Sequence, residues 1–171
     1  MEFNLVIGWI AGLAGAIAMS LLMKMGTSMG MSKMPDMAVI QGAMFTDDQH
    51  TAKRIGMFTH IILMGALVFG TAYAALFAAF GTASWLAGIG IGVVHGLMAG
   101  AVGMPMMGSM HPRMQPAEHL GGAMLRADVS GLSIAEPGFF GRNYGGGTPA
   151  GLIMGHAVFG LVLALVYNAL S

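Results

Sequence analysis

The sequence predicts an all-α fold: a transmembrane four-helix bundle built from two repeated helical hairpins. Three observations support it, namely long stretches without charge, the confinement of the basic residues, and a repeat of short motifs. The stretches 3–23, 55–112 and 143–171 contain no Asp, Glu, Lys or Arg. A bilayer core of about 30 Å needs about 20 apolar residues per helix, so the outer stretches supply one span each and the central one supplies two.

The ends of the spans carry recognisable signals. Ser84 can cap the third helix after a tight turn at 81–84, and Pro149, next to Thr148, suits the first turn of the fourth. Pro105 is expected to close or kink the third helix near its end. The predicted spans are 4–24, 56–80, 84–107 and 149–170.

The charged residues predict the orientation of the chain. All seven basic residues fall in two windows, 24–54 and 113–142, and six of the seven acidic residues share them. With an even number of spans both windows face one side, which the positive-inside rule assigns to the cytoplasm. We expect a protein of the cell (inner) membrane, embedded in the lipid bilayer, with both termini outside and the charged loops cytoplasmic.

Two halves of the chain repeat one another within a single membrane domain, 1–171. Residues 40–44 (Ile-Gln-Gly-Ala-Met) match 120–124 (Leu-Gly-Gly-Ala-Met), and the second helix of each half has a His near its start and a Tyr near its end. Repeat one covers about 4–80 and repeat two about 84–170. The His and Tyr residues of this pattern are His60 with Tyr73 in repeat one and His156 with Tyr167 in repeat two. The alternative explanation is chance similarity in a chain rich in Gly, Ala and Met.

The windows between the spans each predict a short amphipathic helix on the inner surface. The first begins at Pro35-Asp36 and the second at Pro116, and each then has apolar residues on one helical face. The segment 129–148 lacks periodicity and predicts a loop.

Small residues predict how the helices pack. Gly88, Gly92, Gly96 and Gly100 recur every fourth residue along the third helix. Such stripes let helix backbones approach closely in lipid. Shorter stripes occur at Gly8 and Gly12, and at Gly151 and Gly155.

Composition argues against several function classes. The chain has no cysteine, which excludes disulfides, zinc–thiolate sites and thiol nucleophiles. The spans contain no carboxylate for acid–base work, so we expect no enzyme. Seven basic and seven acidic residues balance one another, so the sequence has no basic patch of the kind that binds nucleic acid.

Methionine and histidine supply the candidate site. The chain has nineteen methionines, and apart from Met1 all of them lie in the inner half of a span or in the two windows. Histidine within a span is usually functional, because ionisable groups there are costly. His111 and His119 lie in loops and are expected to be solvated, and His50 is the weakest candidate of all. The predicted inner site is His60, His95, His156, Met19, Met23, Met64 and Met98, with Met25, Met29, Met106 and Met110 at its mouth.

Copper is the metal these side chains favour. Thioether sulfur selects Cu(I), and imidazole suits copper, zinc or iron. The spacing Met25-xxx-Met29 resembles the Met-xxx-Met element of copper-transporter channels, although the resemblance covers that element alone. The alternative for the methionines is packing, because methionine fills gaps between Gly-rich helices.

Two other functions remain open. The chain is also suited to be a non-catalytic structural or assembly subunit of a larger membrane complex, or a homo-oligomer, with its Gly and Met faces as contact surfaces. A b-type haem held between His60 and His156 is the third hypothesis.

Most of the chain resembles small uncharacterised four-span membrane proteins of bacteria and archaea. The matching features are a Gly-rich first helix over 12–23, a short amphipathic segment at 36–44, and a second helix opening on His60 before Gly65. A last helix with His156-xxx-Gly160 completes the pattern. The resemblance implies a membrane location and no particular activity.

Overall fold

The computed structural model describes all residues from 1 to 171, and most of them are helical. Four helical segments are long and apolar enough to cross a membrane, and this confirms the prediction of four long apolar helices. They are α1 (Leu5–Ser28), the run of α3, η1 and α4 (Gln49–Met57, Phe58–Phe69 and Gly70–Phe80), the run of α5, η2 and α6 (Trp85–Met98, Ala99–Gly103 and Met104–Met110), and α7 (Thr148–Leu170).

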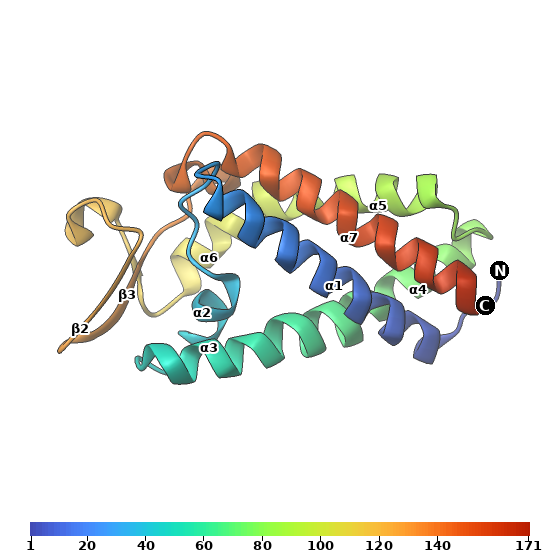
Figure 1. Cartoon of the computed structure of the whole chain (residues 1–171), viewed down its shortest axis with the longest axis horizontal. Coiled ribbons are helices and arrows are strands. Elements are labelled where there is room, and N and C mark those ends of the chain that lie inside the picture. The colour runs from blue at the N-terminus through green and yellow to red at the C-terminus, as the bar shows by residue number, and fades with distance from the viewer. The chain divides into compact units, whose positions relative to one another are not determined.

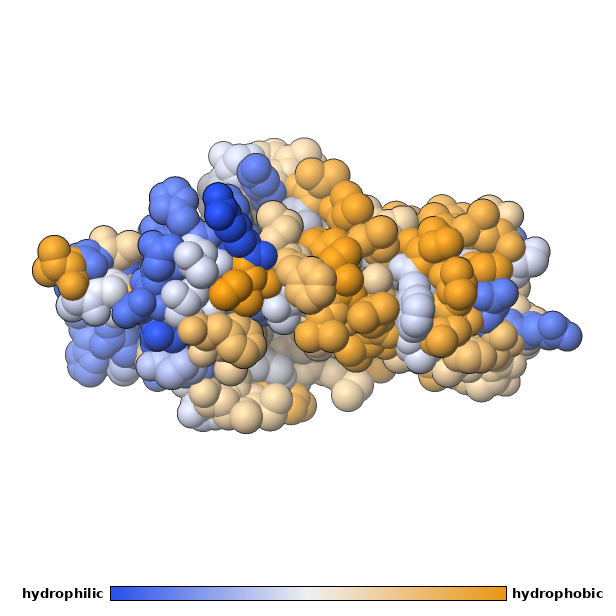
Figure 2. Space-filling model, turned by 90° about the horizontal axis from the view of Figure 1, so that it is seen from below, coloured by the Kyte–Doolittle hydropathy of each residue, from blue (hydrophilic) through white to orange (hydrophobic).

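The chain divides into two compact units. The helical unit comprises Met1–Met23, Ile61–Leu97 and Ile153–Ser171, and the loop unit comprises Lys24–His60 and Met98–Leu152. All seven basic residues belong to the loop unit, and Glu2 is the one acidic residue of the helical unit. Figure 2 shows mostly hydrophobic side chains on the visible face of the helical unit. The segregation of charge seen in the sequence therefore follows the two units.

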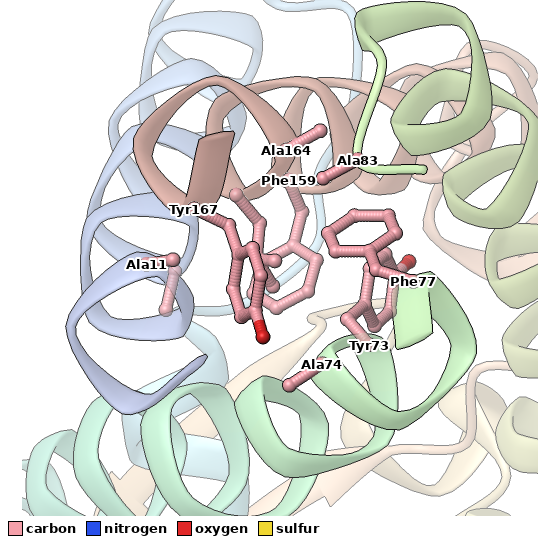
Figure 3. Close-up of a cluster of buried hydrophobic side chains, with 10 residues drawn as sticks. Ala11, Tyr73, Ala74, Phe77, Ala83, Phe159, Ala164 and Tyr167 are labelled. Atoms are coloured by element: carbon pink, nitrogen blue, oxygen red, sulfur yellow. The ribbon is translucent and has the colours of Figure 1, made fainter. Parts of the chain in front are cut away.

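Four aromatic side chains form the centre of the helical unit, surrounded by small residues (Figure 3). Tyr73 and Phe77 from α4, and Phe159 and Tyr167 from α7, are each at most 3% exposed. Ring centroids lie 5.3 Å apart for Tyr73 and Phe159 and 5.5 Å apart for Phe77 and Tyr167, in edge-to-face contact. Each such pair contributes about 0.5–1.5 kcal/mol beyond its buried area.

Glycines let the helices of this unit approach closely, as the stripes predict. A Cβ atom built on Gly8 of α1 would lie 2.8 Å from the carbonyl oxygen of Gly70 in α4. One built on Gly88 of α5 would lie 2.5 Å from the Cβ of Ala164 in α7. Figure 1 also shows α1 and α7 side by side, where a Cβ on Gly15 would lie 2.8 Å from the Phe159 carbonyl oxygen. The backbones leave no room for side chains at these positions.

The third span starts where the sequence predicts and ends later. The Ser84 hydroxyl accepts a hydrogen bond from the Ala87 N–H (3.2 Å), and the preceding turn contains Gly81 at φ 70°. Pro105 does not close the helix, which continues to Met110. Proline lacks an N–H and clashes with the carbonyl one turn earlier in an α-helix. The wider π-helical turn η2 ends at Gly103, just before Pro105, and makes room for the proline ring so that the helix continues.

A second π-helix, η1, covers twelve residues of the second span. It begins at Phe58, and near its start the Thr59 hydroxyl donates to the Ile55 carbonyl (3.0 Å). π-Helices are rare, usually last one turn, and often occur at functional sites. Two predicted site residues, His60 and Met64, lie on η1.

The first half of the loop unit contains two helices, α2 (Met37–Gly42) and α3. As predicted, a helix follows Pro35-Asp36: Asp36 is the N-cap residue of α2, and its carboxylate accepts a hydrogen bond from the Ala38 N–H (3.0 Å). The two helices cross at glycines, because a Cβ on Gly42 would overlap the carbonyl oxygen of Ala52 and one on Gly56 would overlap that of Ala38. Backbone contact therefore holds this helix pair together.

The predicted amphipathic helix at Pro116 is wrong, since the second window forms mainly a small sheet. A single 3-10 turn, η3 (Ala117–Leu120), ends at Gly121 and Gly122, whose φ angles of 64° and 82° suit glycine and stop a helix. Further along, the Asp128 carboxylate accepts from the Ser130 N–H (2.9 Å), which forms the turn of a hairpin. The strands are β1 (Met114–Gln115), β2 (Leu125–Asp128) and β3 (Gly131–Ala135). The fold is thus mostly helical rather than all-α.

The sheet has the order β1-β3-β2, with β3 in the centre. Ile134 of β3 lies opposite Met114 in the parallel pair and opposite Leu125 in the antiparallel pair. It belongs to the segment 129–148, so the predicted loop contains a buried strand and, after it, a 3-10 segment, η4 (Phe139–Tyr144). The two windows fold differently, and the duplication of the chain stays a prediction.

Candidate functional site

Two histidines of the helical unit lie against each other. His95 comes from α5 and His156 from α7, and their ring centroids are 4.5 Å apart with the ring planes at 72°. His156 is 7% exposed. The close contact has a local cause in α5, because a Cβ built on Gly96 would lie 3.1 Å from the Cβ of His156. The glycine stripe thus admits the imidazole of α7 between the two helices.

Aromatic side chains enclose His95 on several sides. The Phe69 ring centroid lies 4.1 Å from that of His95, and the Phe159 centroid lies 6.0 Å away. The Tyr73 hydroxyl lies 3.3 Å from Nδ1 of His95. His95 therefore has a hydrogen-bond partner at one ring nitrogen and an apolar lining around its ring.

Two of the predicted methionines pack against the helix that carries His156. The sulfur of Met23 would lie 3.1 Å from a Cβ on Gly155, and Cγ of Met19 would lie 3.5 Å from it. Both are residues of α1, and Gly155 directly precedes His156. Between them on the same turn of α1, the buried Ser20 hydroxyl oxygen has no hydrogen-bond partner. Met64, the other methionine predicted for this unit, is half-buried on η1.

The remaining predicted ligands belong to the loop unit. Nδ1 of His60 lies 3.4 Å from the amide nitrogen of Gln41. The predicted methionine ligands in this unit are exposed by half or more of their surface, so they do not form its interior. They are Met25, Met29, Met98, Met106 and Met110.

The donor set is small. No group of three or more His, Cys, Asp or Glu side chains is close enough together to hold a metal ion. The helical unit instead brings together two imidazoles, with thioethers packed on the neighbouring turn. This set offers nitrogen and sulfur, which suit soft and borderline metals, and no carboxylate for a hard cation.

One histidine is buried where the sequence predicts a solvated one. His111 is 5% exposed, its Nε2 lies 2.9 Å from the Ile40 carbonyl oxygen, and its Nδ1 accepts the Arg113 N–H (3.1 Å). Burial lowers the pKa of His111, the hydrogen bond to the Ile40 carbonyl offsets part of this effect, and the nearby Arg113 charge lowers the pKa again. His119 is exposed, as predicted, and His50 is exposed as well.

Arg113 reinforces this contact between the two windows. Its guanidinium donates to the carbonyl oxygen of Ala43, at the end of α2. Side chains just after α6 thus satisfy carbonyls at the C-terminal end of a helix in the first window. No spacing in the sequence indicates this contact, because the partners are about seventy residues apart.

Comparison of the chain with protein-family models, with curated proteins and with solved structures yields no match.

Proposed function

We propose that the chain is an integral membrane protein that binds copper, as Cu(I), between His95 and His156. The contact of the two imidazoles, at 4.5 Å between ring centroids, is the observation that carries the proposal. Two neighbouring polar rings are costly in an apolar span, where histidine usually serves a function. Neutral imidazole is a good ligand for copper.

The methionines of α1 are proposed as the soft part of the site. Met19 and Met23 pack next to Gly155, one residue before His156. A thioether selects Cu(I) over harder cations. The unpartnered hydroxyl of Ser20 on the same turn also favours a polar occupant, because a buried hydroxyl without a hydrogen bond is unfavourable. Nitrogen and sulfur donors without a carboxylate fit copper better than magnesium or calcium.

The exposed methionines of the loop unit are proposed to collect the ion. Met25 and Met29 are 55% and 69% exposed, and Met106 and Met110 are 52% and 67% exposed. Each pair is one helical turn apart, so two sulfurs lie on one face. In the proposed orientation these loops are cytoplasmic, in the cell membrane, with both termini outside.

The test is the copper content of protein purified in mild detergent from copper-supplemented cells. We expect near-stoichiometric copper in the wild type and its loss in the His95→Ala/His156→Ala variant. His119→Ala is the matched control, because it removes an exposed imidazole outside the spans. Equal copper contents in the double variant and the control would show that His95 and His156 do not bind the ion. The visible absorption of the same sample tests for b-type haem.

A groove on the helical unit favours a second candidate function, that of a non-catalytic subunit of a larger membrane complex. The groove has a volume of about 500 Å³ and lies between α4 and α5. Gly90 leaves it open, since nothing lies within 4 Å of a Cβ built there. Co-purification of larger proteins with the wild type, and their loss from a Gly90→Leu variant, would support this function. A homo-oligomer that elutes alone would contradict it. The lining residues are Leu76, Phe80, Ala87, Gly90, Ile91 and Val94.

A further inference from the structure

We infer that Tyr73 is a positioning residue for His95: its hydroxyl holds Nδ1 and leaves Nε2 as the nitrogen that binds the metal ion. The inference rests on the proposed copper site and assigns a role to a tyrosine that is not itself a ligand. It follows from the hydrogen bond of the ring, from the packing of Tyr73, and from the chemistry of imidazole.

The hydroxyl of Tyr73 is held in place by the core of the helical unit. Tyr73 is 2% exposed, and its ring meets those of Phe77 and Phe159 edge to face, with centroids 6.1 Å and 5.3 Å away. Figure 3 shows Tyr73 on α4 beside these two rings. Because the ring is packed in this way, the position of its hydroxyl, 3.3 Å from Nδ1 of His95, is set by α4 and α7.

The His95 ring is restrained from a second direction. The Phe69 ring lies 4.1 Å from it between centroids, at an angle of 38° between the planes. Packing against Phe69 limits the tilt of the imidazole, and the hydrogen bond to Tyr73 limits its rotation. The ring is thus held by the Phe69 contact and by the hydrogen bond at Nδ1, and neither of these interactions occupies the other ring nitrogen, Nε2.

Neutral imidazole has one protonated nitrogen and one with a lone pair. A metal ion binds the lone pair, so the hydrogen bond at the other nitrogen decides which one is available. Ligating histidines almost always donate this second N–H to an oxygen. With Nδ1–H donating to the Tyr73 oxygen, the lone pair is on Nε2. A neutral phenol also suits an apolar span, where a carboxylate would be costly.

The first experiment measures Cu(I) affinity by competition with a chelator, in wild type, Tyr73→Phe and Tyr167→Phe. Loss of such an outer hydrogen bond weakens metal binding about 10–100-fold, which we expect for Tyr73→Phe. Tyr167→Phe is the matched control, because Tyr167 is 0% exposed in the same core and its hydroxyl bonds to the Asn4 N–H and the Glu2 carbonyl. Wild-type affinity in Tyr73→Phe, or equal weakening in both variants, would overturn the inference.

The second experiment reads the His95 tautomer from ¹⁵N chemical shifts of the metal-free protein. We expect the Nδ1–H form in the wild type and a mixture of both forms in Tyr73→Phe. A wild-type ring protonated at Nε2 would overturn the inference, whether or not the variant folds. If the wild type binds no copper, the proposed function fails, while the tautomer still shows whether Tyr73 orients His95.

Discussion

The substitution Gly88→Ala tests whether backbone contact between α5 and α7 holds the helical unit together. The new Cβ would lie 2.5 Å from the Cβ of Ala164, and closer still to the carbonyl oxygen of Gly160. Ordinary van der Waals contact begins at 3.4 Å, so the Cβ atoms of residues 88 and 164 must move apart by at least 3.4 − 2.5 = 0.9 Å. Neither obstacle is the flexible end of a side chain, so the helices themselves have to separate.

The control Gly90→Ala isolates this effect. Gly90 is on the same helix, two residues further along, and nothing lies within 4 Å of a Cβ built there. Both substitutions change helix propensity and unfolded-chain entropy in the same way, so these contributions cancel in the comparison. Overpacking costs about 1–3 kcal/mol, and we expect Gly88→Ala to be less stable than Gly90→Ala by this amount.

The assay is the free energy of unfolding in detergent micelles, measured by denaturant titration for both variants and the wild type. Gly90→Ala should match or slightly exceed the wild type, while Gly88→Ala should fall below it. Equal stability of the two variants would refute the close approach of α5 and α7.

Two further predictions concern the loop unit. Gly56→Ala places a Cβ on the Ala38 carbonyl oxygen and should lower the free energy of unfolding by about 3 kcal/mol, measured by denaturation. Gly26→Ala, with nothing within 4 Å, is its control, and equal effects would contradict the α2–α3 contact. Acidification should destabilise the wild type more than His111→Gln, as measured by melting temperature at pH 7.5 and 5.5. Because burial lowers the His111 pKa, its stabilising contribution is complete above the ordinary value of about 6.5 and is lost as pH falls below it. Equal drops in melting temperature would contradict this.

The number of long apolar helices could be predicted because it depends on local composition. The uncharged stretches match four apolar helices, and the caps at Asp36 and Ser84 lie where the sequence places them. The end of the third span was less predictable, because the π-helical turn before Pro105 lets the helix continue.

The second window shows where reading by helical period fails. Leu120, Ala123, Met124 and Ala127 share a helical face in the sequence, yet the chain forms a sheet after Leu120. The positive φ angles of Gly121 and Gly122 prevent the helix from continuing. The pair of glycines, followed by Asp128 and Gly131, was the signal for a turn and a hairpin.

The sequence by itself determined the four long apolar helices, the placement of the basic residues outside their uncharged stretches, and the positions of His60, His95 and His156 within those stretches. These features depend on windows of about 20 residues, and the cost of charge in lipid acts on such windows directly. The tertiary structure decided that His95 meets His156 and that His111 is buried against Ile40. Each residue turns a helix by about 100°, so the direction of a side chain depends on helix rotation. That rotation is set by packing between distant segments, such as Gly96 against His156.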